Sequence, residues 1–230
     1  MVGGSPLDAE TLSVQLDVML RMQSELNSIV FPDWAERRFA WHRAIYVEAA
    51  EYLEHLGTWK WWKKGSPDMA QARMELVDIW HFGLAWYLNA EPEGKSSSSL
   101  VSRILSDIIS AEKTAMPLAL DSAEANKQHL SKVDKLVAEA GNGTFSTESF
   151  VHILAYNQMS FDLLYRQYVG KNVLNRFRQE NGYKSGKYIK TWHGHEDNEQ
   201  LDCILSKLPS DSSLPERVHA ELTSLYRTVT

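Results

Sequence analysis

Apolar side chains recur at spacings of three and four residues through most of this 230-residue chain. That period is typical of α-helices with one buried face, whereas half-buried strands show strict alternation of apolar and polar residues. No stretch of the sequence alternates in this way over any length, and no internal repeat of fixed period is present. The pattern therefore predicts an all-α fold, a multi-helix bundle whose helices bury their apolar faces against one another.

Capping residues and prolines indicate where the first helices begin and end. Helix starts are expected at Ser5–Pro6, after Pro32–Asp33 and at Ser66–Pro67. Gly57 should end the second helix, because glycine adopts the left-handed conformation that closes many helices. The third helix should run to about Ala90.

The rest of the chain is expected to be helical with a few interruptions. The segment 91–99 (EPEGKSSSS) is polar and predicts a flexible linker. Residues 100–140 predict two amphipathic helices with a break near Pro117 and Asp121. A long helix should then follow, from a cap at Ser146 or Thr147 to the region of Gly170.

Composition excludes several classes of protein. The net charge is −6, which argues against general nucleic-acid binding. The single cysteine, Cys203, allows no intramolecular disulfide. The longest near-apolar run (IWHFGLAWYL) is too short to span a bilayer, and the N-terminal residues lack the pattern of a secretory signal. We expect a soluble, intracellular protein of the cytoplasm with no membrane or nucleic-acid partner, and an organelle or the nucleus as alternative locations.

Two pairs of carboxylates interrupt segments that are otherwise apolar. Glu48 and Glu51 lie in IYVEAAEYL, and Glu75 and Asp78 lie in ARMELVDIWHF. Residues three apart share one face of a helix, so each pair projects together. Four like charges near a core are unfavourable unless a cation neutralises them. Because Mg²⁺ prefers oxygen ligands, the two pairs predict a magnesium site, although a single pair of this kind is common on solvated helices.

A basic and aromatic segment near the C-terminus is the second chemical feature. GKNVLNRFRQENGYKSGKYIKTW carries six cations in an acidic protein. Lys and Arg supply charge for phosphate oxygens, and glycine lets the backbone approach a ligand closely. The segment contains no GxxxxGK[ST] phosphate-binding loop. A solvated basic face and a nucleic-acid contact are alternative interpretations, but a triphosphate held between this segment and a metal at the acids would use both features.

These motifs resemble the dimeric all-α dUTPase family, within the wider all-α nucleoside triphosphate pyrophosphohydrolases. The wider group is marked by an ExxE pair followed by an ExxD pair on the next helix. The more specific resemblance lies in MLRMQSELN, VEAAEYLEHLGTWKWWKKG, ELVDIWHF and YVGKNVLNRFRQENGYKSGKYIKTWHGHEDNEQL. It implies a single all-α domain over residues 1–230 with the active site between core helices. The core motifs are at 15–90 and 147–203, and a variable helical insert occupies about 91–145.

The resemblance also implies an activity: Mg²⁺-dependent hydrolysis of dUTP, and of dUDP as a second candidate substrate, to dUMP with release of pyrophosphate or phosphate, by a homodimer. The catalytic and metal-binding residues it implies are Glu48, Glu51, Glu75 and Asp78, with Glu48 also activating the attacking water. The base and sugar pocket it implies consists of Gln23, Asn27, Trp62, His81 and Asn198. The phosphate contacts it implies are Lys171, Asn175, Arg178, Tyr183, Lys184 and Lys190.

Several alternatives remain open from the residues alone. Gln23 and Asn27 lie four apart on one helix and can bond to each other instead of to a base. His81 next to Phe82 is compatible with a hydrogen-bonded core histidine. The same metal chemistry could serve a dCTP or broader dNTP pyrophosphatase, because the metal does not choose the base. A non-catalytic helical interaction protein is the alternative of a different class.

Overall fold

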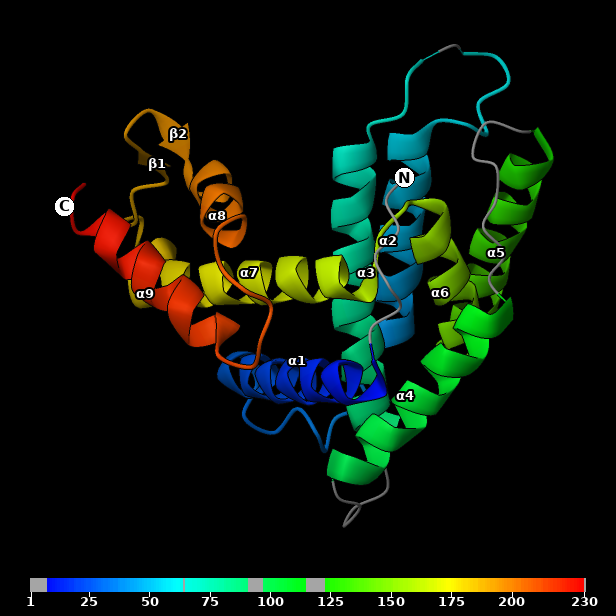
Figure 1. The fold of residues 1–230 in the computed structure, drawn as a ribbon, viewed down its shortest axis with the longest axis horizontal. Helices are drawn as coiled ribbons and strands as arrows, with labels where there is room; N and C mark the ends of the chain where they lie inside the picture. The colour runs from blue at the N-terminus through cyan, green and yellow to red at the C-terminus, as the bar shows by residue number, and fades with distance from the viewer. Residues whose placement is uncertain (1–7, 64, 91–96, 115–122, 230) are drawn as a thin grey trace. The chain divides into compact units, whose positions relative to one another are not determined.

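The computed structural model describes residues 8–63, 65–90, 97–114 and 123–229 (Figure 1), and within these residues it is almost entirely helical. The elements in the described residues are α1 (Ala9–Val30), α2 (Trp41–Leu56), α3 (Met69–Ala90), α4 (Ser97–Thr114), α5 (Ala123–Gly141), α6 (Thr147–Tyr156), α7 (Phe161–Glu180), the 3₁₀ helix η1 (Tyr183–Ser185), β1 (Thr191–Trp192), β2 (His195–Glu196), α8 (Asp197–Leu205) and α9 (Leu214–Tyr226). The all-α prediction is confirmed. None of the described helices combines the length and apolar character that a membrane crossing needs.

The chain divides into two compact units, Met1–Phe161 and Asp162–Thr230. Each unit is described by itself below. The prediction of one domain over the whole chain stays a prediction.

The first unit is organised around the pair α2 and α3, which pack along each other (Figure 1). Helix α5 packs against α2, and α1 packs against α3 and α4. Helix α6 packs against both α4 and α5. At the centre the Trp80 ring of α3 stacks on the Phe150 ring of α6, with centroids 5.2 Å apart and planes 8° apart. Burial of such aromatic surface is the main force that holds the helices together.

Helix α2 begins later than the sequence predicted. The backbone from Phe31 to Arg37 forms successive turns, such as the Trp34 N–H to Phe31 carbonyl bond of 3.0 Å, and the helix begins only at Trp41. Its end is confirmed, because Gly57 has φ 62° and donates its N–H to the Leu53 carbonyl. The start of α3 is set by the Asp68 carboxylate, which accepts the Gln71 N–H at 3.1 Å.

The expected linker was partly wrong, because α4 begins at Ser97 and so includes its last serines. The remainder of that linker (91–96), the helix start at Ser5–Pro6 and the break near Pro117 lie outside the described residues.

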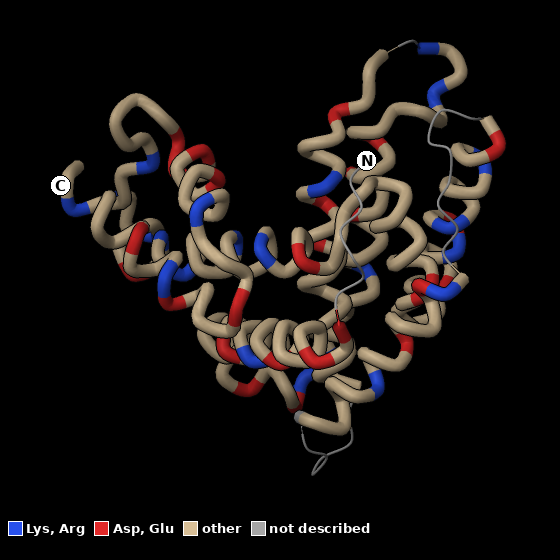
Figure 2. Tube along the Cα trace, in the orientation of Figure 1, with Lys and Arg blue, Asp and Glu red and all other residues tan. Residues whose placement is uncertain are grey.

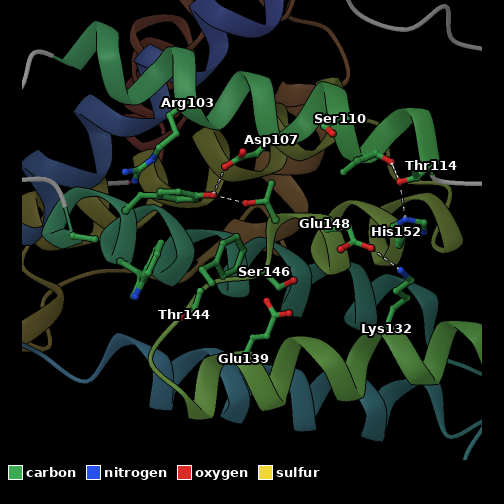
Figure 3. Close-up of a pocket in the computed structure, with 16 residues that line it drawn as sticks. Arg103, Asp107, Ser110, Thr114, Lys132, Glu139, Thr144, Ser146, Glu148 and His152 are labelled. Atoms are coloured by element: carbon green, nitrogen blue, oxygen red, sulfur yellow. Dashed lines mark hydrogen bonds and ion pairs between the residues drawn. The ribbon is translucent and has the colours of Figure 1, made fainter.

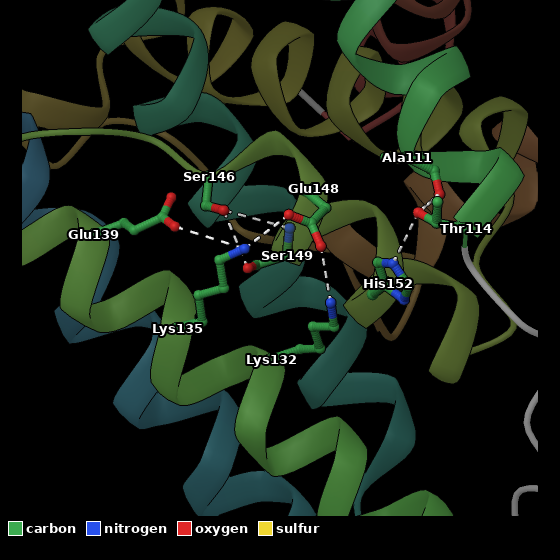
Figure 4. Close-up of polar contacts among 9 residues, drawn as sticks. All are labelled: Ala111, Thr114, Lys132, Lys135, Glu139, Ser146, Glu148, Ser149 and His152. Atoms are coloured by element: carbon green, nitrogen blue, oxygen red, sulfur yellow. Dashed lines mark hydrogen bonds and ion pairs between the residues drawn. The ribbon is translucent and has the colours of Figure 1, made fainter.

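The single long helix from Ser146 to Gly170 was also wrong. Ser146 does cap a helix, accepting the Ser149 N–H at 3.4 Å (Figure 4), but α6 ends at Tyr156 and α7 begins at Phe161. The backbone leaves the helix at Gln158, whose φ of 51° lies in the left-handed region, and Arg73 holds this turn by donating from Nε and Nη2 to the Asn157 carbonyl at 3.1 and 2.9 Å.

The second unit packs α7 against α8 and closes around a cluster of aromatic rings. A Cβ on Gly170 would lie 2.7 Å from the Leu205 side chain, so the two helices touch at a position where only glycine fits. The strands β1 and β2 pair antiparallel in a two-residue hairpin. The clustered rings are Phe177, Tyr188, Trp192 and Tyr226.

Gly83→Ala is expected to destabilise the protein by about 1–3 kcal/mol, the usual cost of overpacking. A Cβ on Gly83 would lie 2.8 Å from the Phe145 ring, and that ring is held in place by contacts with Trp80, Tyr87 and Phe150. Urea unfolding monitored by circular dichroism measures the change in the free energy of unfolding.

The matched control is Gly141→Ala, because a Cβ on Gly141 would meet no atom within 4 Å. Glycine to alanine in a helix normally gains up to about 1 kcal/mol, so the control should be neutral or stabilising. Equal effects of the two substitutions would contradict the packing of Phe145 on Gly83.

Candidate metal and nucleotide site

The acidic cluster forms where α2 and α3 pack together in the first unit. Carboxylate oxygens of Glu48, Glu51 and Glu75 lie within 4.8 Å of one another. Glu75 is buried, Glu48 is half-buried and Glu51 is exposed, so the cluster reaches from the helix interface to the surface. Asp78 is half-buried one turn beyond Glu75, and its charge acts on Glu48. The structure thus brings together three of the four acids predicted from sequence and places the fourth close to them.

The electrostatics of the cluster show how crowded these charges are. Burial, together with the negative charges of Asp78, Glu51 and Glu75, raises the pKa of Glu48 to about 7 from its ordinary value of 4.5. A hydrogen bond between Glu48 and Glu75 acts in the same direction. A proton shared in this way substitutes for a cation, which indicates a position where positive charge is favoured.

The donor set fits Mg²⁺. With Mg–O distances near 2.1 Å, two ligand oxygens of an octahedral site lie no more than about 4.2 Å apart. The three carboxylates already come within 4.8 Å of one another, so small side-chain rotations bring them into that range. All donors are carboxylate oxygens, the ligand type that this hard cation prefers.

His55 is a neighbour of the cluster that the sequence analysis did not single out. Its Nε2 lies 3.3 Å from a carboxylate oxygen of Glu75, across the interface between α2 and α3. His55 follows Glu51 by four residues, so helical spacing alone places it on the same face. That spacing was the signal that could have found it.

Glu48→Gln is expected to raise the melting temperature of the metal-free protein near pH 8 by about 2–4 °C, the shift that roughly 1 kcal/mol gives in a chain of this length. Glu48 has a pKa of about 7 when folded and 4.5 as its ordinary value. Between pH 4.5 and about 7 the folded state therefore binds a proton on Glu48 that the unfolded state has released. The free energy of unfolding falls as the pH rises through this range, because the folded state gives up that proton. Calorimetry near pH 5 and near pH 8 measures the difference, which should be small at the lower pH.

The control is Glu221→Gln, which removes the same charge from an exposed position on α9. It should leave the melting temperature unchanged at both pH values. A similar gain from both variants would mean that net charge, and not crowding at Glu48, sets the pH dependence.

Two residues predicted for the base pocket lie buried on α1. Gln23 donates from Nε2 to Oδ1 of Asn27 at 2.9 Å, so the two amides do bond to each other. The Nδ2 atom of Asn27 is buried and has no hydrogen-bond partner within the described residues. A buried amide nitrogen without an acceptor costs free energy, and a carbonyl oxygen of a ligand would satisfy it.

The other two predicted pocket residues of this unit differ in burial. His81 is buried on α3, and its Nδ1 lies 2.9 Å from the Val77 carbonyl. That carbonyl can only accept, so Nδ1 carries the proton and Nε2 is the acceptor of the ring. Trp62 is 58% exposed and packs edge-on against Trp59 and Trp61. More than half of this side chain is therefore accessible to a ligand, as a stacking contact requires.

The predicted phosphate residues lie in the second unit, where cations recur along α7 and the segment after it (Figure 2). Arg178 forms a two-pronged ion pair with Asp197, with Nε and Nη2 each 2.8 Å from a carboxylate oxygen. It also donates to Asn175 at 3.3 Å and to Asn198 at 3.2 Å. These four bonds leave one of its five N–H groups, on Nη1, for a ligand.

Asp197 is the second residue that the sequence analysis missed. Its side chain is fully buried. Burial by itself would raise the pKa of Asp197, but hydrogen bonds from Arg178 and Tyr188 outweigh it and the pKa is lowered. Asp197 lies in the acidic run HEDNE, where nothing in the sequence separates it from its exposed neighbours. Its role is to fix Arg178, and through it the amides of Asn175 and Asn198.

The remaining phosphate candidates are more exposed. Lys190 pairs with Glu196 at 3.1 Å, and both side chains are about half exposed. Tyr183 is 50% exposed and Lys184 is exposed at the 3₁₀ helix. Lys171 is half-buried on α7. Exposed lysines reorient at little cost, so this group can adapt to a phosphate chain.

A cavity of about 690 Å³ lies in the first unit, lined by α4, α5, the last turns of α3 and the start of α6 (Figure 3). Of the charged side chains that line it, Lys132 pairs with Glu148 at 2.9 Å, and Lys135, which does not line it, reaches the same carboxylate at 2.7 Å (Figure 4). None of the residues predicted for metal or substrate lines it. The acidic cluster is therefore the stronger candidate for the functional site.

The helical fold and the carboxylates shared by two helices place the chain among all-α proteins with an acidic cluster that could hold a metal ion. A family model described as dUTPase matches residues 15–183, which is more than half of the chain. The chain therefore belongs to the dUTPase family, and this membership supports the activity of a dUTP diphosphatase, a hydrolase. No curated protein matches the sequence. The matched span includes all four acids, while Lys184, Lys190 and Asn198 lie beyond its end.

Proposed function

We propose that this protein hydrolyses dUTP to dUMP and pyrophosphate with Mg²⁺ as cofactor, and that dUDP is a second substrate that yields phosphate. The observation that carries the proposal is the acidic cluster of α2 and α3, in a chain that belongs to the dUTPase family. The active site is then the interface between these two helices.

The proposed ligands of Mg²⁺ are Glu48, Glu51, Glu75 and Asp78. The bound cation neutralises negative charge on the phosphates and lowers the pKa of water. Glu75 is buried and contacts His55, so it is held most firmly. The exposed position of Glu51 leaves the outer side of the cluster open to a substrate.

Glu48 is the proposed general base. In the metal-free protein burial and the neighbouring acids raise its pKa to about 7. A bound cation opposes this shift, so Glu48 is ionised near neutral pH and can accept a proton. It takes a proton from the attacking water as the new P–O bond forms, and the bond between phosphorus and the bridging oxygen breaks. The electron pair of that bond leaves with the departing phosphate group.

The base and the phosphates have separate sets of proposed contacts. Asn27 offers its buried Nδ2 to a carbonyl oxygen of uracil, oriented by its bond to Gln23. His81 and Trp62 are the other proposed base and sugar contacts from the first unit, and Asn198 of the second unit is proposed as a contact from the sequence resemblance alone. The proposed phosphate contacts are Lys171, Asn175, Arg178, Tyr183, Lys184 and Lys190.

The proposed assembly is a homodimer. Apolar side chains are exposed at the end of α1, where Ile29 and Val30 are 59% and 65% exposed, and Trp61 is 90% exposed. Exposed apolar side chains of this size are typical of the central part of protein interfaces.

Sedimentation equilibrium should give about twice the 26.2 kDa of one chain, and Val30→Asp should shift the mass towards the monomer. A monomeric wild-type protein at micromolar concentration would contradict the assembly.

The experiment that tests the function is release of pyrophosphate or phosphate from dUTP, dUDP, dCTP, dTTP and UTP, with and without Mg²⁺. Mg²⁺-dependent cleavage of dUTP, alone or with dUDP, is the expected result. Preference for dCTP would retain the acidic cluster and overturn the roles of Gln23, Asn27 and His81. No turnover of any nucleotide would favour a non-catalytic helical protein.

Asp78→Ala is expected to abolish Mg²⁺-dependent turnover, because it removes a ligand and the charge that acts on Glu48. Asp134→Ala, at an exposed position of α5, is the control and should retain full activity. If Asp78→Ala kept wild-type activity and the same Mg²⁺ requirement, the metal assignment would be wrong.

A further inference from the structure

A buried polar network lies directly behind the acidic cluster. Tyr52 is fully buried on α2, one residue after Glu51. Its hydroxyl accepts a hydrogen bond from Nδ2 of Asn157 at 2.6 Å and lies 2.8 Å from Nε2 of His129. Asn157 and His129 are 0% and 2% exposed, so water does not compete for these bonds.

The hydrogen bond between Tyr52 and His129 can form with either ring tautomer. The Tyr52 hydroxyl accepts from Asn157 and shares a hydrogen bond with Nε2 of His129, in which either atom can be the donor. Within the described residues Nδ1 of His129 is buried without a hydrogen-bond partner. Burial lowers the pKa of His129 to about 4, so the ring is neutral near physiological pH. The neutral ring stacks on Tyr156, with centroids 3.7 Å apart and planes 7° apart.

The network joins four helices. Tyr52 belongs to α2 and His129 to α5, while Asn157 follows α6 directly. The carbonyl of Asn157 accepts two bonds from Arg73 of α3, which precedes Glu75 by two residues. Asn157 therefore bonds through its side chain to the helix of Glu48 and through its backbone to the helix of Glu75.

These hydrogen bonds fix the rotation of the helices about their axes, which apolar packing alone leaves variable. Hydrophobic contact has no preferred direction, whereas a hydrogen bond requires a narrow range of distance and angle. Glu48 and Tyr52 are four residues apart and so lie on adjacent turns of one side of α2. With side chains about 5–6 Å from the helix axis, a rotation of roughly 10° moves a carboxylate by about 1 Å. Metal-binding and catalytic sites tolerate a displacement of their side chains of only about 0.5 Å.

We infer that Tyr52, His129, Asn157 and Arg73 form a positioning network that sets the rotation of α2 against α3 and thereby the separation of the acids that bind Mg²⁺. His129 lies on α5, within the segment that matched no motif in the sequence, so the insert takes part in building the metal site. The inference rests on the proposed function for the identity of the cation.

The test compares Tyr52→Phe with Tyr87→Phe. Both remove the hydroxyl of a buried tyrosine in the first unit, but Tyr87 bonds to Thr147 near the far end of α3. Tyr52→Phe is expected to raise the Mg²⁺ concentration for half-maximal dUTP turnover about tenfold, the usual effect of losing a group that orients a metal ligand. Tyr87→Phe should lower the melting temperature and leave the Mg²⁺ requirement unchanged.

A second pair of variants keeps the test decisive if Tyr52→Phe does not fold. His129→Gln retains an acceptor for the Tyr52 hydroxyl, whereas His129→Leu does not. The glutamine variant should keep a Mg²⁺ requirement near that of the wild type, and the leucine variant should raise it. Wild-type Mg²⁺ requirements in all four variants, with changes in melting temperature alone, would overturn the inference and leave the network a purely structural feature.

A readout without turnover separates this inference from the proposed function. Mg²⁺ binding is also measured as the rise in melting temperature that added Mg²⁺ produces. If the wild type cleaves no dUTP yet is stabilised by Mg²⁺, the proposed function fails. The rise in melting temperature that Mg²⁺ produces in each variant, compared with that of the wild type, then still tests the network. If Mg²⁺ stabilises nothing, there is no metal site to position and the inference fails as well.

Discussion

The repulsion between the carboxylates of α2 and α3 is the constraint on which the candidate site depends. Glu48, Glu51 and Glu75 are held within 4.8 Å of one another by helices whose packing is apolar. The stabilisation comes from the surrounding core, in which rings such as Trp80 and Phe150 are fully buried. Folding thus concentrates negative charge at one place, and the raised pKa of Glu48 is the direct consequence. A divalent cation relieves the same repulsion, which is why metal binding and stability are coupled in such a site.

In the second unit a buried carboxylate is surrounded by hydrogen-bond donors instead of by other acids. Asp197 is completely buried, but Arg178 and Tyr188 donate to it and its pKa is lowered. The charge is satisfied within the unit, so Asp197 needs no ligand and serves to fix Arg178. The pKa of the half-buried Glu48 is raised, first by burial and then by the neighbouring acids, whereas hydrogen bonds from Arg178 and Tyr188 outweigh burial and lower the pKa of Asp197. Negative charge thus stays uncompensated in the first arrangement and is compensated within the chain in the second.

The sequence predicted those features that depend on local pattern. Helical periodicity gave the helical class, Gly57 marked the end of α2, and the spacing of Glu48 with Glu51 placed two carboxylates on one face. The sequence-based prediction failed where contacts between residues distant in sequence determine the structure. The turn after α6 is held by Arg73, which is 84 residues from Asn157. The partner of Arg178 is 19 residues away and resembles its exposed neighbours. No local window contains that information.

The same distinction explains why paired acids alone are a weak signal for a metal site. An ExxE pair on a solvated helix and one at a helix interface look identical in sequence, since both satisfy the spacing of three. They differ in whether the rest of the fold prevents the acids from turning away from each other. On a solvated helix the side chains separate and the repulsion vanishes at no cost. In this chain α2 cannot rotate without breaking the bonds of Tyr52 to Asn157 and His129. The carboxylates consequently remain close to one another, so that their repulsion can be relieved by a proton on Glu48 or by a bound cation.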